Sequence, residues 1–437
     1  MRKNKVEWLC ALGVLGALAL TGIFVPPAPQ AATGNPIIPG DVAWMLTASA
    51  LVLLMTPGLS FFYGGMVQRK NVISTMLQSF IAMGVVSVLW VAVGFSLAFG
   101  DSLGGLIGNP ATHLMFRGVG LATHPALAPT IPLALFALFQ LKFAIITPAL
   151  ITGSFAERVR FASYILFVVL FTLFVYCPVA HWTWHPDGFL RKWGVLDFAG
   201  GTVVHMTAGF AALAGAAFMG RRKAHLAGYP HVPANIPFVL LGTGMLWFGW
   251  FGFNAGSALA ANESAVLAFM TTNTASAAAM LAWVFFVAVR GRRPSALGAA
   301  IGAVVGLVAI TPAAGYVPVG ASIAIGTGAS LISNLAVHWR SRTDLDDTLD
   351  VFPCHGVGGI VGMVATGLFA DKVGLVHGPT TLFIRSLGAI AIVGAYSFAV
   401  SYALYRVTDL LITLRVRPEQ EDAGLDVSQH AESFSGA

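Results

Sequence analysis

Charged residues are scarce in this sequence. Asp, Glu, Lys and Arg make up 10% of the 437 residues, whereas hydrophobic residues make up 57%. Such a chain cannot cover a soluble globule with polar side chains, and its runs of roughly 20 apolar residues are long enough to cross a bilayer as helices. In lipid the backbone must satisfy its own hydrogen bonds, which helices of this length do. The composition therefore predicts an all-α polytopic membrane protein.

Cysteine is also rare. Cys10, Cys177 and Cys354 are too few and too scattered for a disulfide framework or a metal-binding motif, so we interpret them as small buried thiols. Cys354 precedes His355, but no carboxylate or amide that would orient a nucleophilic pair is placed with it. Lys and Arg residues outnumber Asp and Glu residues, which gives a net charge of +6. Because this surplus comes mostly from arginines between the apolar runs, it does not indicate a nucleic-acid partner.

The first 32 residues have a basic start, an apolar stretch from Trp8 to Val25, and a small-residue end at Ala31 and Ala32. This pattern is typical of a cleaved secretory signal peptide. The apolar stretch is long for a signal peptide, so a retained membrane anchor is the alternative.

Eleven further apolar segments follow, at approximately 42–65, 74–99, 130–153, 160–180, 199–219, 236–258, 264–289, 295–312, 316–338, 354–370 and 382–413. One alternating set of loops, with the tail, carries fourteen Lys or Arg residues, and the opposite set carries four. The positive-inside rule then places the mature N-terminus outside and the C-terminus in the cytoplasm, which eleven spans allow and ten would not. We expect a leader over 1–32, a transmembrane domain over 33–413 and a cytoplasmic tail over 414–437.

Two stretches of the chain share one pattern, DFAGGTVVHMTAG at 197–209 and DTLDVFPCHGVGG at 347–359. In each, a His follows an Asp by eight residues and a Gly follows the His by four. Eight helical residues rise about 12 Å and turn about 80° beyond two full turns, so the Asp and His share a broad stripe. Each copy closes a block of five segments. Since an odd number of spans inverts the next block, we expect an inverted five-helix repeat, helices 1–5 and 6–10, plus a long eleventh helix.

This repeat brings His205 and His355 toward the membrane midplane from opposite faces, where inverted-repeat transporters place their site. Ionisable residues inside apolar segments are candidate functional residues. A lone membrane histidine often only bonds a neighbouring helix, but two related by a repeat favour a pathway. Asp197 is expected to cap its helix, and a further role for it in the pathway stays open.

A small cation could use other residues near the outer ends of these segments. The aromatic residues are Phe143, Trp184 and Phe253, and Ser257 lies near the end of its segment. An aromatic face attracts a cationic ammonium-type group by about 0.5–2 kcal/mol, and a Ser hydroxyl can accept its hydrogen bond. Taken singly, each residue is also typical of packing or of an interfacial belt.

Deprotonation is the less costly way for a small amine-type cation to cross the membrane. An ion of that size loses solvation worth on the order of 20 kcal/mol by the idealised Born cost, and several kcal/mol after relaxation. Removing a proton from an amine of pKa about 10 at pH 7 costs about 4 kcal/mol. The two histidines could each offer one donor or acceptor nitrogen to the neutral molecule, while the proton follows separately or returns outside.

Several stretches are long enough to indicate a family. The chain from about residue 41 to its end resembles the Amt/Mep/Rh ammonium transporters, on the Amt side. The stretches that carry this resemblance are TPGLSFFYGGMVQRKN (56–71), FQLKFAIITPALITGSFAER (139–158), LDFAGGTVVH (196–205), GWFGFNAGSA (249–258), DVFPCHGVGGIVG (350–362) and GLDVSQHAE (424–432).

The resemblance implies a bacterial inner-membrane homotrimer with one ammonium pore per subunit, and no enzymatic activity, ATP or redox cofactor. It implies that the loop over 221–231 and the tail, as a regulatory segment, engage a PII-type signalling protein. The matching motifs imply an external recruitment site of Phe143, Trp184, Phe253 and Ser257, a stacked gate of Phe143 and Phe253, a central pair of His205 and His355, and an essential acidic Asp197 near the entrance.

The sequence departs from the family pattern near the entrance. Lys142 precedes Phe143 at a position where we expect an uncharged residue, and it points about 100° away from Phe143 on a helix. It either faces a subunit contact, extends outward, or faces the entrance and repels ammonium. Arg191 and Lys192 also lie near the entrance, and Trp182 competes with Trp184 for the recruitment role.

Two other functions remain open. One is an ammonium sensor of the same fold whose pore conducts slowly; a long signalling domain would favour it, and the tail here has roughly 20 residues. The other is a membrane haem or metal protein that uses the histidine pair as ligands, although the helices lack the further ligands of a closed metal site.

Overall fold

A computed structural model describes the backbone of residues 2–26 and 35–434 and the side chains from residue 6 onward in these ranges. The expected end of the leader at Ala31 and Ala32, and the last tail residues 435–437, lie outside the described residues.

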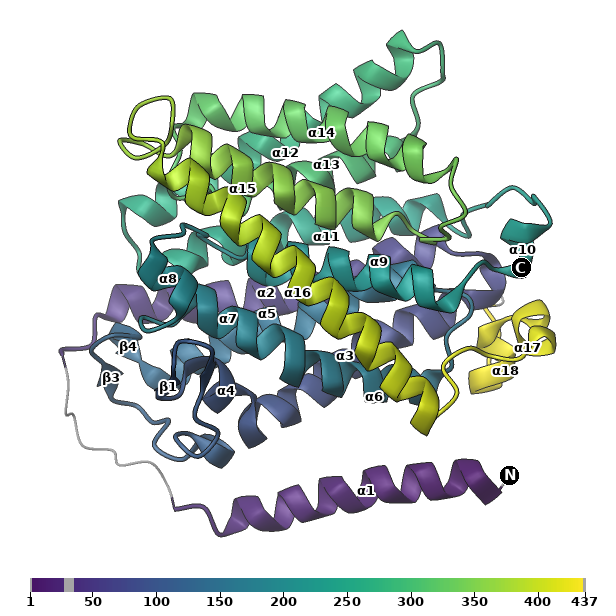
Figure 1. Cartoon of the computed structure of the whole chain (residues 1–437), viewed down its shortest axis with the longest axis horizontal. Coiled ribbons are helices and arrows are strands. Elements are labelled where there is room, and N and C mark those ends of the chain that lie inside the picture. Colours follow the sequence, from purple (N-terminus) through teal and green to yellow (C-terminus); the bar gives the residue numbers. More distant parts are fainter. Residues whose placement is uncertain (1, 27–34, 435–437) are drawn as a thin grey trace.

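The first block of five spans begins after residue 35. It comprises α2 (Pro39–Met66); α3 (Val72–Leu89) continued by η2 (Trp90–Gly94) and α4 (Phe95–Phe99); α5 (Leu133–Phe155); α6 (Phe161–Phe171) continued by η4 (Thr172–Tyr176) and α7 (Cys177–Trp184); and η5 (Gly201–Met206) continued by α9 (Thr207–Met219). The second block comprises α11 (Ile236–Ala255), α12 (Glu263–Val289), α13 (Ala296–Ile310), α14 (Val319–Arg340), and η7 (Phe352–Gly356) continued by α15 (Val357–Phe369). The eleventh span, α16 (Thr381–Leu411), crosses the outside of both blocks (Figure 1).

Short elements connect the spans. They are η1 (Arg69–Asn71), η3 (Leu114–Phe116), α8 (Phe189–Trp193), α10 (Lys223–Leu226), η6 (Gly256–Ala258), α17 (Pro418–Ala423), α18 (Leu425–His430), and two antiparallel strand pairs, β1 (Ser102–Leu103) with β2 (Ile107–Gly108) and β3 (Thr123–His124) with β4 (Ala128–Pro132). We call the end of the bundle that carries β1–β4 the strand face and the end that carries α17 and α18 the tail face (Figure 1).

The expected membrane fold is confirmed. Ten of the eleven segments expected after the leader are long and apolar enough to cross a membrane, and the eighth is a shorter apolar helix, Ala296–Ile310. Its 15 residues rise about 22 Å. In the described residues, α1 (Arg2–Ile23) contains one more apolar span, Val6–Ile23.

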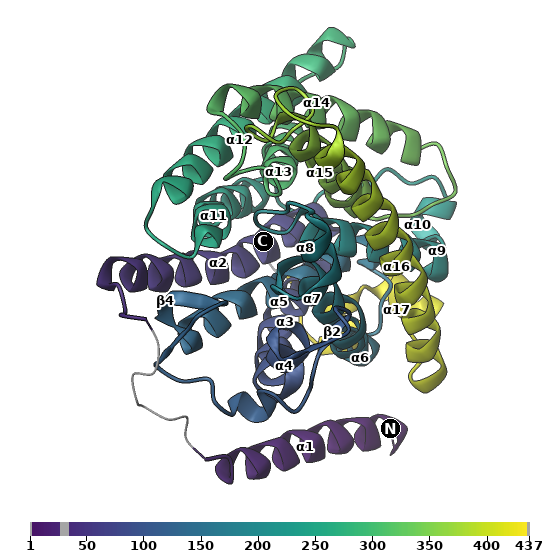
Figure 2. The same ribbon diagram turned by 60° about the vertical axis from the view of Figure 1, so that its left-hand side comes forward.

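Helix α1 lies beside the bundle and not within it (Figures 1 and 2). None of its apolar span is buried. Its contacts with the body include an ion pair between Glu7 and Arg160 at 3.1 Å and a ring contact between Trp8 and Phe161 with centroids 6.4 Å apart. The bundle therefore completes its core without α1.

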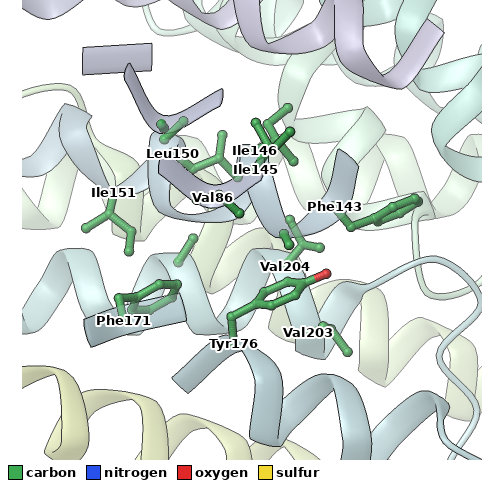
Figure 3. Packing of buried hydrophobic residues seen from close by; sticks show 14 of the residues in the cluster. Val86, Phe143, Ile145, Ile146, Leu150, Ile151, Phe171, Tyr176, Val203 and Val204 are labelled. Carbon is green, nitrogen blue, oxygen red and sulfur yellow. The ribbon is translucent and has the colours of Figure 1, made fainter. Parts of the chain in front are cut away.

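The core of the first block centres on α5, the most deeply buried span. Its apolar side chains, among them Ile145, Ile146 and Leu150, pack with Val204 of η5 and with neighbouring helices (Figure 3). Because α5 is enclosed on nearly every side, its position is fixed where it carries Phe143.

The tail packs against the start of α3. The Asp426 carboxylate accepts hydrogen bonds from the backbone N–H groups of Ile73 at 3.1 Å and Ser74 at 2.8 Å. Lys70 Nζ donates to the backbone oxygens of Glu421 at 3.0 Å and Asp422 at 2.9 Å. The tail thus caps a transmembrane helix that lies more than 300 residues earlier in the sequence.

A buried ion cluster ties three loops of the tail face together. The Arg222 guanidinium donates to Asp346 Oδ2 through Nε and to Asp346 Oδ1 through Nη2, each at 2.9 Å, and to Glu157 Oε2 through Nη1 at 2.7 Å. Burial alone would raise the pKa of Asp346, but Arg222 and Arg158 hold it well below its usual range. A carboxyl group with a lowered pKa stabilises the fold above its usual pKa, and this contribution is lost only as the pH falls through the lowered value.

Arg222→Ala is therefore expected to lower the free energy of unfolding by about 3–5 kcal/mol at pH 7, because it leaves buried carboxylates without their cation. In the variant, Asp346 keeps Arg158 but loses Arg222, one of the two cations that lower its pKa, so its pKa rises and the stability deficit should shrink as the pH falls from 7 to 5. Unfolding in mixed detergent micelles at both pH values measures this. Equal stability of the parent and the variant at pH 7 would contradict the role of the cluster.

Candidate functional site

An open cavity of about 610 Å³ lies at the strand face, and we call it the vestibule. Its wall includes four of the residues expected at the entrance, Phe143, Trp184, Asp197 and Ser257. They come from α5, the end of α7, the segment before η5, and η6, so four separate elements converge here. Phe253 lies directly behind this wall, because its ring packs against that of Phe143 with centroids 4.3 Å apart.

The structure decides between the two tryptophans of α7. The indole N–H of Trp184 donates to the backbone oxygen of Asp197 at 3.2 Å, and its ring lines the vestibule. Trp182 instead donates to the backbone oxygen of Leu106 at 2.6 Å and its ring contacts Tyr396. Trp184 is thus the tryptophan available to a molecule in the vestibule.

Of the three cationic residues expected near the entrance, only Arg191 lines the vestibule. Lys142 is not part of this wall, although Gln140 and Phe143 of the same helix are. Lys192 forms an ion pair with Asp187 at 2.7 Å. The lysine next to Phe143 therefore does not repel a cation in the vestibule by direct contact.

Two phenylalanine rings separate the vestibule from the interior. The Phe143 and Phe253 centroids lie 4.3 Å apart with an interplanar angle of 38°, and the Trp184 ring meets Phe143 edge-on at 5.6 Å. Phe143 is 1% exposed and Phe253 is 0% exposed. The rings leave no open passage, so any molecule that crosses must displace them.

A narrow apolar lumen follows below the rings. One cavity of about 10 Å³ is lined by Phe253, Trp250 and both histidines, and another of about 10 Å³ continues from His355 toward Tyr63 and the tail face. A cavity of this size holds about one water-sized molecule. The vestibule, the two rings and the two narrow cavities thus follow one another from the strand face toward the tail face.

The central histidines meet as the inverted repeat predicts. His205 Nδ1 and His355 Nδ1 are 3.3 Å apart, and the ring centroids are 5.4 Å apart. One ring must donate and the other accept in this hydrogen bond. His205 and His355 are 1% and 3% exposed, and His205 Nε2 has no hydrogen-bond partner among the described residues. The pair therefore presents an unused nitrogen inside the lumen.

Both histidines lie in π-helical turns, η5 and η7. Single π-helical turns occur often at functional sites, because the wider turn changes the direction of its side chains. The repeated glycines explain how the two turns approach. A Cβ atom on Gly209 would collide with the backbone of Gly356, and one on Gly359 would lie 3.3 Å from His205 Cβ. Each glycine of the repeat thus makes room for the other copy.

Asp197 caps its helix, as expected. Its carboxylate accepts hydrogen bonds from the backbone N–H groups of Gly200 at 2.8 Å, Gly201 at 2.7 Å and Thr202 at 2.7 Å, and from the Thr202 hydroxyl. Asp347 of the second copy caps η7 in the same way, by accepting from Phe352 N–H at 2.8 Å. In both copies the acid therefore holds the turn that carries the histidine.

Sequence reasoning missed Trp250. Its indole stacks on His205 with centroids 5.4 Å apart and an angle of 19°, and its N–H donates to the Thr311 hydroxyl at 2.9 Å. The signal was present, since Trp250 precedes Phe253 by three residues and so shares its side of α11. The two side chains together form one wall of the lumen.

The metal-site alternative gains no support from the geometry. Among the described residues, no group of three or more His, Cys, Asp or Glu side chains is placed to hold a metal ion. A closed site needs about four ligands, whereas the cavity that both histidines line is otherwise bordered, among the described residues, by aromatic, aliphatic and methionine side chains.

Comparison with known proteins shows which family the sequence matches. A model of the Ammonium Transporter Family matches residues 43–434. The ammonium transporter of Aquifex aeolicus is 47% identical over 401 residues, which cover 90% of this chain and 92% of that protein. The ammonium transporter of Mycobacterium tuberculosis strain H37Rv is 44% identical over 432 residues, with 90% of each chain covered.

Solved structures share the fold. The crystal structure of Saccharomyces cerevisiae Mep2 superposes with a TM-score of 0.85 at 33% identity and covers 92% of this chain and 93% of Mep2. A structure named Sensor Amt Protein superposes with a TM-score of 0.83 at 30% identity and covers 90% of this chain and 98% of its own. With a family model over nearly the whole chain and relatives above 40% identity, the chain belongs to the ammonium transporter family.

Proposed function

We propose that the protein takes up ammonium at its strand face and passes ammonia, with or without the proton, through the lumen to its tail face. One observation carries the proposal, namely that the Phe143–Phe253 stack lies between an open polar vestibule and a narrow apolar lumen that contains a histidine pair. A site that binds a cation and a passage that suits a neutral molecule are thus arranged in series.

The vestibule recruits the ion. Trp184 and Phe143 present aromatic surface, which attracts ammonium by about 0.5–2 kcal/mol. The Ser257 hydroxyl donates a hydrogen bond to the Phe253 backbone oxygen, so the lone pairs of the hydroxyl are free to accept a hydrogen bond from the ion. Asp197 adds a buried negative charge to the same wall.

The stacked rings favour loss of the proton before entry. Beyond Phe253 the lining is almost entirely apolar, so an ammonium ion there would lose several kcal/mol of solvation even after relaxation. Deprotonation costs about 4 kcal/mol at pH 7. In the lumen, ammonia exchanges hydrogen bonds with His205 and His355, and the mutual hydrogen bond of the pair offers a route by which a proton can be relayed.

The wider arrangement follows the same proposal. Residues 1–32 act as a cleaved signal peptide, with a retained anchor as the alternative. Residues 33–413 then form the transport domain in the bacterial inner membrane, with the mature N-terminus outside. The subunits assemble as a homotrimer. Residues 414–437 and the loop over 221–231, which meet where Lys223 N–H donates to Glu421 Oε1 at 2.7 Å, offer a cytoplasmic surface to a PII-type protein.

A sensor of the same fold is the second candidate, favoured by the likeness to Sensor Amt Protein. Such a protein would bind ammonium in the vestibule but conduct it slowly.

The test is an electrical recording from purified protein in liposomes after an ammonium pulse. A saturable inward current is expected, which would mean that charge crosses the membrane. A rise of internal pH without current would mean net passage of ammonia. If neither signal exceeds that of empty liposomes, the transport proposal fails and the sensor replaces it.

A further inference from the structure

Lys142 is a charged residue that has no role in the pathway proposed above. It lies in α5, one position before Phe143, and is only 9% exposed. Among the described residues its ammonium group has no hydrogen-bond or ion-pair partner, and it does not line the vestibule. A lysine inside a membrane span needs a partner or a route to water or lipid headgroups.

The usual lean of side chains on a helix points Lys142 toward the surface of the bundle. Helical side chains lean toward the N-terminus and cover the preceding turn. One turn before Lys142 lies Leu138, which is 38% exposed, whereas the rest of α5 is almost fully enclosed. A side chain at position 142 that leans in this way extends toward the small area in which α5 reaches the surface.

A second unpartnered polar side chain lies on α12. Asn273 is exposed in the middle of this span, one helical turn after the exposed apolar residues Phe269 and Met270. Within the described residues its amide forms no hydrogen bond. Polar side chains on the surface of a membrane helix commonly bond across to another helix.

The two side chains lie at similar distances from the starts of their helices. α5 and α12 both begin at the strand face, and Lys142 and Asn273 follow their helix starts by nine and ten residues. At 1.5 Å per residue, both lie about 14–15 Å along their helices. An ammonium donor and an amide oxygen acceptor thus lie at similar distances along their helices, on separate surfaces of one chain. A heterologous contact between identical subunits joins two such different surfaces.

We propose that Lys142 of each subunit donates a hydrogen bond to the side-chain oxygen of Asn273 of the partner subunit. This inference rests on the homotrimer proposed above, in which three such contacts close the ring. Because α5 also carries Phe143, the partner subunit helps to hold the helix on which the gate depends.

Charge exchange tests the contact in the full-length protein. Asn273→Lys should place two ammonium groups against each other and weaken the trimer at least about 10-fold. Adding Lys142→Glu should restore trimer stability to within about 3-fold of the parent, since opposite charges then meet. The control is Phe285→Lys, which adds an exposed lysine to the same helix far from Asn273 and should not be rescued by Lys142→Glu. The trimer fraction is measured on native gels over a detergent series.

Cross-linking provides a second measurement that does not depend on charge. In a Cys10→Ser background, Lys142→Cys with Asn273→Cys should give covalent dimers and trimers with a bifunctional methanethiosulfonate, since Cys177 and Cys354 are buried. A trimeric parent that shows neither rescue nor cross-linking would overturn the contact and leave the transport proposal intact. A monomeric parent that still transports would overturn the assembly and the contact, but not the pore.

Discussion

Replacing Asp197 with Ala is expected to abolish the ammonium-driven current in liposomes, a fall of more than about 100-fold. The substitution leaves the N–H groups of Gly200, Gly201 and Thr202 without their acceptor at the start of η5. Each buried donor left unsatisfied costs about 1–3 kcal/mol, so the turn must rearrange. His205 lies in this turn and would lose its alignment with His355.

The same substitution removes the negative charge from the vestibule wall, and Asp197→Asn separates the two effects. The amide keeps one acceptor oxygen and the shape of the side chain but loses the charge. If capping dominates, Asp197→Asn should retain a measurable current. If attraction of the cation dominates, both variants should be silent while Asp197→Asn unfolds like the parent. A parent-like current in Asp197→Ala would overturn both roles.

Replacing His205 with Ala is expected to reduce the current by about 10- to 100-fold. The variant loses the hydrogen bond to the His355 ring while that ring carries the relayed proton, and a hydrogen bond to a charged group contributes about 1.5–3 kcal/mol. The remaining His355 would face an apolar lumen formed by side chains such as Trp250 and Phe253. A proton could then no longer be handed from one ring to the other, whereas neutral ammonia could still pass. The internal pH should therefore still rise after an ammonium pulse while the current is nearly lost.

His355→Ala should behave in the same way, because the pair shares one hydrogen bond. His338→Ala is the matched control, since this histidine lies near the tail-face end of α14, away from the lumen. Equal loss of current and of the pH signal in His205→Ala would contradict separate paths for the proton and ammonia. An unchanged current would remove the pair from the transport route.

The Asp197→Ala and His205→Ala substitutions disturb different parts of the structure. Asp197 acts on the backbone of η5 through three N–H donors, whereas His205 is held from both sides, by Trp250 and by His355. Loss of the imidazole therefore leaves the surrounding helices in place. This is why we expect a complete loss of function from Asp197→Ala and a selective one from His205→Ala.

Some features of the protein could be determined from the sequence alone. The membrane fold and its blocks of five spans follow from apolar length and from the uneven distribution of Lys and Arg between loops. The pairing of His205 with His355 follows from the Asp–His–Gly repeat, because an inverted second block must bring equivalent positions together. The cap at Asp197 could be predicted for a similar reason, since an acid at a helix start meets free N–H groups in any fold.

The tertiary structure alone decided which neighbour of each motif faces the pathway. Trp182 and Trp184 lie on the same turn of α7, and their different hydrogen-bond partners, Leu106 and Asp197, show which of them the fold turns toward the vestibule. Lys142 and Phe143 are adjacent and point about 100° apart, and the packing of α5 decides which of them lines the vestibule. Local sequence sets the angle between side chains on one helix, but the rotation of that helix about its axis depends on contacts with residues far away in the chain. The sequence therefore named the candidate residues of the proposed pore, and packing decided which of them line the vestibule and the two narrow cavities.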